Sequence, residues 1–143
     1  MARVVVEKAR ASAVAKIVRD GLIRHNRAFA GPFRYRNLVL SAREGRRIVG
    51  GLVADCAWNY VYVHLLWVDE AARGKDHGRR LMREAERVAR KRGAALVYLN
   101  TFTFQAPKFY EKLGYRRFAA LKNTPASGTT RYFYVKRLSG ARA

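Results

Sequence analysis

Hydrophobic periodicity divides this chain into strand-like and helix-like stretches. Seven stretches have the alternating or continuous apolar pattern of strands: residues 3–9, 38–42, 48–55, 60–68, 95–101, 115–121 and 131–138. Residues 13–25 and 78–92 repeat apolar positions every third or fourth residue, which predicts two amphipathic helices. A shorter helix is predicted from Pro107 to Leu113, because proline suits the first turn of a helix.

Local signals set the expected ends of these elements. Ser12 is expected to cap the first helix, and Gly93 to end the second. The first helix is expected to turn five apolar residues inward: Val14, Ile17, Val18, Leu22 and Ile23. The succession of strand 60–68, helix 78–92 and strand 95–101 is a βαβ unit, so part of the sheet should be parallel. A mixed α/β fold is therefore predicted.

The composition indicates an ordinary globular protein. A length of 143 residues suits one domain, expected to span residues 1–143, and a hydrophobic content of 50% is enough for a core. Apolar runs are too short for a membrane span, and no signal peptide is recognised, so a cytoplasmic protein without membrane association is expected. The single cysteine, Cys56, excludes an internal disulfide and is expected to be a buried thiol. No metal site is predicted.

The net charge is the unusual quantity. Thirty Lys and Arg residues stand against ten Asp and Glu, for a formal charge of +20. Such a basic surface serves an anionic partner, such as nucleic acid or an anionic cofactor, or consists of solvated helix faces. A nucleic-acid partner remains possible but is not favoured. Polycationic ligands should be repelled.

The junction between strand 60–68 and helix 78–92 is the most informative stretch. The strand runs into a short polar turn that contains Gly74 and Gly78 among basic residues. Unpaired backbone N–H groups and the helix dipole make such a helix start attractive to anions. Glycine lets a ligand approach the backbone closely, so the turn predicts a site for a phosphate or pyrophosphate.

A second motif lies downstream, where residues 100–115 are NTFTFQAPKFYEKLGY. Together, the turn at residues 73–78 and this block make the chain resemble the GNAT superfamily of acyl-CoA-dependent N-acetyltransferases. The turn corresponds to the family's Gln/Arg-x-x-Gly-x-Gly/Ala, and the block to a bacterial branch with FQAPxFYxKLGY followed by RYF. The resemblance covers nearly the whole chain. It implies a central, mostly antiparallel sheet of about seven strands with flanking helices, in which the parallel strands 60–68 and 95–101 splay apart.

The resemblance also implies acetyl-CoA as the cofactor, with coenzyme A as a product. The residues then expected to bind it are Leu66, Trp67, Val68, Arg73, Gly74, Lys75, Asp76, His77, Gly78, Arg79, Arg80, Asn100, Thr103, Gln105, Ala106, Phe109, Tyr110 and Lys112. Two of them depart from the family pattern. Asp76 replaces a glycine, which is tolerable if its φ stays negative or if the aspartate adopts the left-handed region, and its carboxylate could cap the next helix. Thr103 replaces an asparagine that holds the pantetheine arm. A hydroxyl can still make one hydrogen bond, so this contact is either weaker or moves to Asn100 or Gln105.

Acetyl transfer needs a proton donor for the leaving thiolate and an acceptor for the amine proton. The resemblance assigns the donor role to Tyr110, since a phenol has a pKa of about 10, and the N–H of Leu66 should polarise the thioester carbonyl. Tyr62 and His64 are two residues apart and so share a strand face, where they could relay the amine proton. A histidine packed in the strand without a catalytic role remains an equal alternative.

Three residues are expected to line the acceptor pocket: Tyr35, Trp58 and Asn59. Ordinary packing would explain the same residues. Because of the net charge, the expected acceptor is the primary amine of a small neutral or zwitterionic molecule. The alternatives are an amine carried by RNA or protein, and a non-catalytic nucleic-acid-binding module. A homodimer is a further possibility, since dimers are frequent in the family.

Overall fold

A computed structural model describes residues 1–138 of the chain. These divide into two compact units, Met1–Phe33 and a second that begins at Arg34, and each is considered by itself below. The prediction of one domain over residues 1–143 stays a prediction. No helix within the described range is both long and apolar enough to cross a lipid bilayer.

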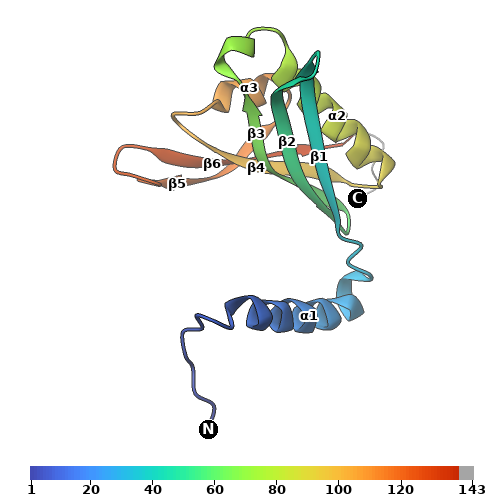
Figure 1. Cartoon of the computed structure of the whole chain (residues 1–143), viewed down its shortest axis with the longest axis vertical. Helices are drawn as coiled ribbons and strands as arrows, with labels where there is room; N and C mark the ends of the chain where they lie inside the picture. Colours follow the sequence, from blue (N-terminus) through green and yellow to red (C-terminus); the bar gives the residue numbers. More distant parts are fainter. Residues whose placement is uncertain (139–143) are drawn as a thin grey trace. The chain divides into compact units, whose positions relative to one another are not determined.

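The first unit consists of helix α1, Ala11–Ala30, preceded by irregular chain (Figure 1). The predicted strand over residues 3–9 is therefore wrong, because a strand needs a neighbour for its backbone groups and this unit offers none. The predicted helix 13–25 is too short, and Arg10 occupies the N-cap position instead of Ser12.

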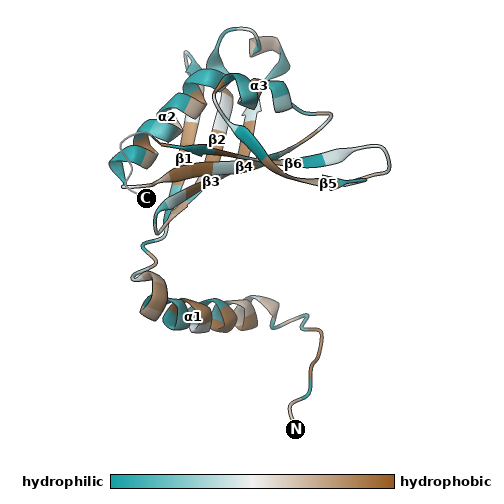
Figure 2. Ribbon diagram, turned by 180° about the vertical axis from the view of Figure 1, so that it is seen from behind, coloured by the Kyte–Doolittle hydropathy of each residue, from teal (hydrophilic) through white to brown (hydrophobic). Residues whose placement is uncertain are grey.

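The inward face predicted for this helix stays a prediction. Within its own unit no residue of α1 is buried, and Ile17, Val18 and Leu22 are exposed there. Figure 2 shows both brown, hydrophobic and teal, hydrophilic stretches on α1. The helix has the expected amphipathic pattern, but its own unit contains no second element against which an apolar face could pack.

The second unit is built on one mixed sheet with the strand order β1-β2-β3-β4-β6-β5. Its strands are β1 Arg36–Glu44, β2 Arg47–Ala57, β3 Tyr60–Val68, β4 Leu96–Phe102, β5 Arg116–Lys122 and β6 Thr130–Arg137. All neighbours are antiparallel except β3 and β4, which are parallel. The α/β class and the βαβ unit are confirmed. The described sheet has six strands instead of about seven.

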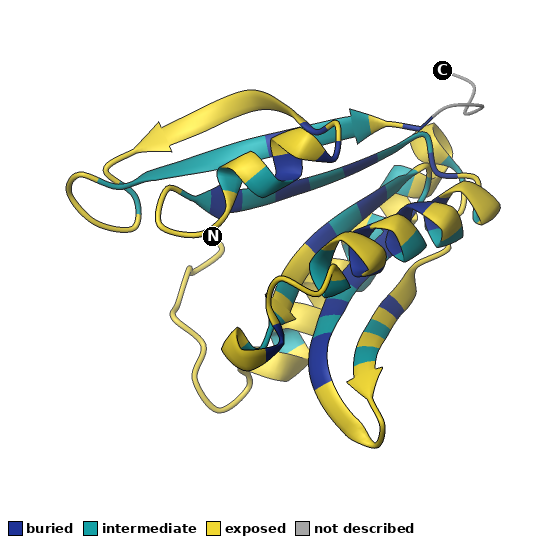
Figure 3. Ribbon diagram, turned by 90° about the horizontal axis from the view of Figure 1, so that it is seen from above, coloured by how far each residue is buried: buried dark blue, intermediate teal, exposed yellow. Residues whose placement is uncertain are grey.

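Helices cover only part of this sheet. The helical elements are η1 Glu70–Ala72, α2 His77–Lys91 and α3 Pro107–Lys112. Helix α2 packs against β1, β2, β3 and β4. Figure 3 shows its dark-blue inner positions facing the sheet and its yellow outer ones facing solvent. The core between them contains Leu52, Ala54, Val61, Val63, Leu81, Met82, Ala85, Ala89, Val97 and Leu99.

The parallel pair separates halfway along its length. Pairing of β3 with β4 runs from Tyr60 opposite Leu96 only to Val63 opposite Leu99. Beyond this point β3 continues beside β2 as far as Val68, while β4 continues beside β6. The expected splay is therefore present, and it opens a gap between the two strands that no backbone ladder closes.

A β-bulge marks the beginning of the splay. In the β2–β3 register Ala54 is opposite Val63 and Val53 is opposite Leu65, so His64 is an extra residue on β3. The bulge shifts the alternation by one position. Val63 is buried, but Leu65 is 64% exposed, and the next residue to pack against the core is Leu66. Simple alternation did not predict this shift.

Candidate functional site

A cavity of about 940 Å³ lies where β3 and β4 part. Its wall is formed by residues 63–68 of β3, the turn after β3, the start of α2, the end of β4 and α3. Most of the expected cofactor residues line it: Leu66, Trp67, Val68, Arg73, Gly74, Asp76, His77, Gly78, Arg79, Asn100, Gln105, Ala106, Phe109 and Tyr110. Lys75, Arg80, Thr103 and Lys112 are not among its lining residues.

The turn before α2 has a left-handed backbone, which is one of the two conformations considered for Asp76. Gly74 has a φ of 80° and Asp76 a φ of 71° with a ψ of 10°, so aspartate replaces glycine without leaving that region. The predicted cap is wrong, because the Asp76 side chain makes no capping hydrogen bond. Its carboxylate lies 3.9 Å from Nε of Arg79 instead. The first N–H groups of α2 therefore have no side-chain cap.

Glu44, a residue that the sequence analysis did not select, organises this turn. Its carboxylate accepts hydrogen bonds from His77 at 3.0 Å and from Lys75 at 3.3 Å. These two bonds, led by the one from His77, hold the pKa of Glu44 below its usual value. Only the β1–β2 hairpin places Glu44 there, since it lies 33 residues before His77. Nε of Arg73 also donates to the carbonyl of Val68, which ties the turn to β3.

Gly78 is required by a close approach of two helices. A Cβ at this position would lie 3.2 Å from Cζ of Phe109 and 3.9 Å from a methyl of Val68. The aromatic ring on α3 thus occupies the space that a side chain on α2 would need. This contact holds α3 against the start of α2 and gives the cavity one of its walls.

Tyr110 lies beside Phe109 on α3 and is only 8% exposed. Its ring is packed among Phe109, Tyr115 and Tyr134, with ring centroids 5.1, 6.1 and 6.4 Å away. No hydrogen bond of its hydroxyl is found within residues 1–138, yet no buried side-chain polar atom there lacks a partner. The hydroxyl is therefore accessible, at the surface of the cavity that Tyr110 lines. Burial raises the pKa of Tyr110 to about 12, so the phenol holds its proton at neutral pH.

A second polar cluster borders the same cavity. Nε2 of His64, the bulged residue, is hydrogen bonded to Oδ2 of Asp55 on β2. The Tyr35 hydroxyl donates to Oδ1 of the same carboxylate at 2.5 Å. Burial acts to raise the pKa of Asp55, but the bonds from His64 and Tyr35 outweigh it and lower that pKa. The sequence analysis did not select Asp55, because only the strand register and the bulge bring it to His64.

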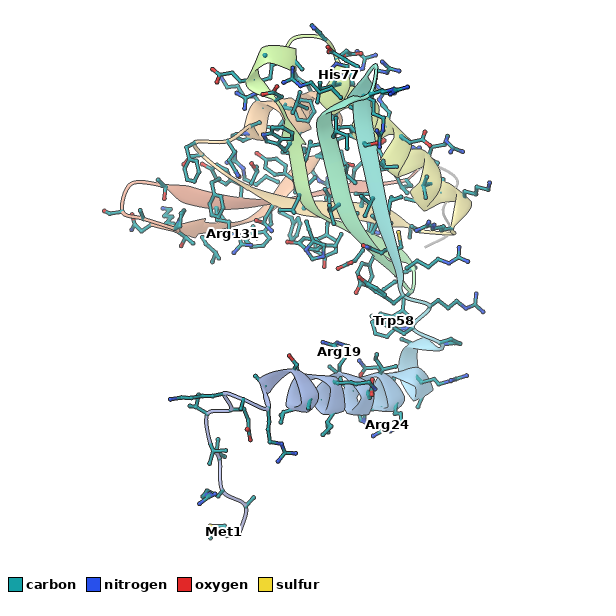
Figure 4. All side chains as sticks on the ribbon, viewed as in Figure 1. Met1, Arg19, Arg24, Trp58, His77 and Arg131 are labelled. Carbon is teal, nitrogen blue, oxygen red and sulfur yellow. The ribbon has the colours of Figure 1, made fainter. Side chains whose placement is uncertain are left out.

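Tyr62 and His64 are neighbours, as their spacing predicts. Their rings meet edge to face with centroids 4.5 Å apart. The Tyr62 hydroxyl accepts a bond from Asn100 at 2.7 Å, and the Asn100 amide oxygen accepts from Nε of Arg131 at 2.8 Å. Since arginine can only donate, this bond fixes the orientation of the Asn100 amide. Arg131, labelled in Figure 4, is thereby connected to the strand that carries His64.

Two residues of the second motif are occupied by structural bonds. Oγ1 of Thr103 accepts from the backbone N–H of Thr130 at 3.2 Å, and this residue does not line the cavity. Oε1 of Gln105 accepts from Thr101 and from the N–H of Phe102, which closes the loop between β4 and α3. The role assigned to Thr103, holding the pantetheine arm, stays a prediction with no support from this placement.

The expected acceptor residues are not among those that line the cavity between β3 and β4. Tyr35 contacts Asp55, but Trp58 lies in the β2–β3 turn, and Figure 4 places it at the opposite end of the β1–β3 strands from His77. Tyr35 and Trp58 line a second cavity of about 780 Å³. Asn59 accepts a bond from the N–H of Ala95 through its backbone carbonyl. Cys56, in the wall of this second cavity, is buried as predicted.

Comparison with known proteins identifies relatives of this arrangement. A family model described as an acetyltransferase (GNAT) domain matches residues 35–117. Blasticidin-S acetyltransferase of Streptomyces morookaense is 42% identical over 96 residues, which are 66% of this chain and 70% of that protein. An acetyltransferase structure from Agrobacterium tumefaciens is 35% identical, with a TM-score of 0.83 over 96% of this chain and 99% of that one.

A more distant structure has the same fold. It comes from Bacillus anthracis, is assigned as a streptothricin acetyltransferase and contains acetyl coenzyme A. Its sequence is 24% identical, and its TM-score is 0.64 over 71% of this chain and 62% of that one.

Proposed function

Since this chain belongs to the GNAT acetyltransferase family, we propose that it moves an acetyl group from acetyl-CoA to the primary amine of a small molecule. The family membership makes it an acetyl-transferring enzyme whose acyl donor is acetyl-CoA. The proposal adds three points to what the family membership shows: the kind of acceptor, the direct transfer of the acetyl group, and the residues that move protons.

The single observation behind the proposal is the cavity between β3 and β4. One end is the turn at residues 73–78, with basic side chains and the uncapped start of α2, which suits the pyrophosphate of coenzyme A. The same cavity extends along the free part of β3 to Tyr110 and His64. A cofactor bound by its phosphates at the turn would lie with its acyl end between these two groups.

Direct transfer assigns each proton a destination. The amine nitrogen attacks the thioester carbonyl carbon, the C–S bond breaks, and the thiolate takes its proton from the Tyr110 hydroxyl. His64 accepts the proton that the amine loses, with Tyr62 beside it as the second group of the relay. The N–H of Leu66 on the splayed part of β3 polarises the carbonyl. Holding both reactants together supplies much of the rate without a covalent enzyme intermediate.

Tyr110 is protonated at neutral pH and therefore has a proton to donate. Its pKa of about 12 lies above the value of about 8.5 for a free thiol, so the transfer of this proton to the thiolate is uphill. The same burial also disfavours the thiolate, which raises the pKa of the thiol and reduces the gap between the two pKa values. Water then returns a proton to the phenolate through the open side of the cavity.

The acceptor we propose is a small neutral or zwitterionic amine. The blasticidin-S acetyltransferase that shares 42% identity supports a small-molecule acceptor. The formal charge of +20 disfavours polycations. Asp55 is the exception to the basic surroundings, and its position beside His64 would attract the ammonium form of a single amine.

The first test is a thermal-shift titration with acetyl-CoA, coenzyme A and ATP at moderate salt. We expect a saturable increase in Tm for the two coenzyme A species, because a ligand that binds only the folded state stabilises it by mass action. An amine screen that records release of free thiol would follow. Equal shifts with all three ligands would indicate general anion binding and contradict the proposed site.

A further inference from the structure

We propose that Asp55 is a positioning residue that fixes His64 as the base for the acceptor amine, with Tyr35 holding Asp55 in place. The inference rests on the proposed function, because it assigns the proton acceptor of that same reaction. It depends on three features of the second unit: the bonds at Asp55, the unoccupied nitrogen of His64, and the bulge on β3.

The bonds at Asp55 determine which nitrogen of His64 carries the proton. With its pKa lowered, Asp55 is ionised at neutral pH and can only accept hydrogen bonds. Nε2 of His64 must therefore be the donor in their contact. In the neutral ring the other nitrogen, Nδ1, then has a lone pair. Within residues 1–138, no hydrogen-bond partner of Nδ1 is found, so this lone pair is available to a ligand in the cavity.

The carboxylate is held from both sides. Its second oxygen accepts the Tyr35 hydroxyl at 2.5 Å, and this bond is the main reason why the pKa of Tyr35 is raised. No lysine or arginine of the described chain forms an ion pair with Asp55. The groups that face the pair are Tyr35 before β1, Tyr62 on β3 and Tyr98 on β4, and burial raises the pKa of Tyr98. The Asp55 charge is thus left to act on His64.

The bulge gives the pair its position. Tyr62 is opposite Asp55 in the ladder. His64, two residues further along β3, is the extra residue of the bulge and lies at the point where β3 leaves β4. His64 therefore reaches back to Asp55 while it lines the cavity that Tyr110 also lines.

Proton transfer through this pair is balanced. The amine N–H bond breaks as nitrogen attacks the thioester carbon, and Nδ1 of His64 takes the proton. The imidazolium that forms is stabilised by the Asp55 carboxylate, which stays ionised, and it later releases its proton to water. Asp55 itself does not contact the substrate, so its effect must pass through His64.

The first experiment does not depend on turnover. Nitrogen-15 NMR of the imidazole rings distinguishes the two tautomers, and the chain has only three histidines, so a His64→Gln variant assigns the signal. We expect neutral His64 to carry its proton on Nε2. In Asp55→Asn we expect a mixture of tautomers, because the carboxylate that accepts the Nε2 proton is gone. A wild-type proton on Nδ1, or no change in Asp55→Asn, would overturn the inference.

The second experiment measures catalysis with an amine found in the screen. Asp55→Asn should lower kcat by about tenfold or more and leave the KM for acetyl-CoA unchanged. The matched control is Asp69→Asn, since the Asp69 side chain is 26% exposed against 27% for Asp55 and pairs with Arg47 away from the cavity lining. An unchanged kcat in Asp55→Asn, with an active wild type, would reject the inference and leave the proposed function standing. A wild type that releases no thiol with any amine in the screen would reject the proposed function itself, and the NMR result would then describe only how His64 and Asp55 are paired.

Discussion

The roles of two neighbouring buried tyrosines should separate cleanly on mutation. Tyr110 and Tyr115 have ring centroids 6.1 Å apart and are 8% and 3% exposed. The Tyr110 hydroxyl has no hydrogen bond within the described chain, whereas that of Tyr115 donates to Oε2 of Glu86 at 3.0 Å. Replacing each with phenylalanine removes one oxygen atom from almost the same environment.

For Tyr110→Phe we expect a catalytic defect without a folding defect. Loss of a general acid costs roughly 10²- to 10⁴-fold in kcat, which corresponds to about 3–5 kcal/mol of transition-state stabilisation. Because no internal hydrogen bond is lost, the free energy of unfolding should change by less than about 0.5 kcal/mol. Thiol-release kinetics and denaturant unfolding measure the two quantities, and acetyl-CoA affinity should remain nearly intact.

For Tyr115→Phe we expect the opposite result. The lost bond goes to the Glu86 carboxylate, which is 2% exposed, and a bond to a charged group contributes about 1.5–3 kcal/mol. At about 4 °C per kcal/mol for a chain of this size, the Tm should decrease by roughly 6–12 °C. Turnover below the transition should be nearly unchanged. If Tyr110→Phe kept full turnover, or if both variants lost activity only in proportion to their unfolded fraction, the assignment of Tyr110 as the acid would be refuted.

Three further predictions concern the turn, the core and acid stability. Gly78→Glu should abolish acetyl-CoA binding in calorimetry, because its Cβ would lie 3.2 Å from the Phe109 ring and its carboxylate beside the pyrophosphate. Gly78→Ala should only weaken binding. Normal binding of acetyl-CoA by Gly78→Glu would mean that the site is misplaced. Lys136→Met should lower the free energy of unfolding in urea by about 3–5 kcal/mol, because Lys136 bonds the buried Glu86 carboxylate at 2.8 Å and the variant leaves that charge without its cation. A decrease below about 1 kcal/mol would contradict this pairing. The pKa of Asp55 is lowered in the folded protein, so the stability that this residue contributes is present above its ordinary pKa of 3.8 and is lost as the pH falls through the lowered folded pKa. The difference in unfolding free energy between wild type and Asp55→Asn should therefore shrink between about pH 5 and pH 2. A difference that stays constant with pH would show that another effect is measured.

The elements that surround the cavity were predictable because their signals are local. A strand, a glycine-containing turn and a basic helix follow one another without interruption, and β3 Tyr60–Val68 has the predicted bounds. The short helix from Pro107 follows from proline chemistry in the same way. The family resemblance rested on these two blocks, and the match of the family model over residues 35–117 confirms it.

The errors at the N-terminus have the opposite origin. Residues 3–9 alternate like a strand, but a strand exists only where a partner accepts its hydrogen bonds, and the sequence does not specify that partner. The apolar positions of α1 likewise indicate an amphipathic helix and leave its contacts open. For Trp58, too, the sequence did not specify its surroundings. Its aromatic ring suggested an acceptor pocket, but the β2–β3 turn that carries it lies at the end of the strands opposite His77, in the wall of the second cavity.

By itself, then, the sequence determined the elements whose signals lie within a few residues: the sheet strands after residue 35, the phosphate turn, α2, and the position of Tyr110 on α3. Only the tertiary structure decided the contacts between distant segments. It paired Glu44 with His77, placed the Phe109 ring over Gly78, and brought Asp55 to His64 through the register of β2 with β3. The physical reason is that propensity and periodicity act along the chain, whereas register, a bulge and packing are settled only when separate strands meet.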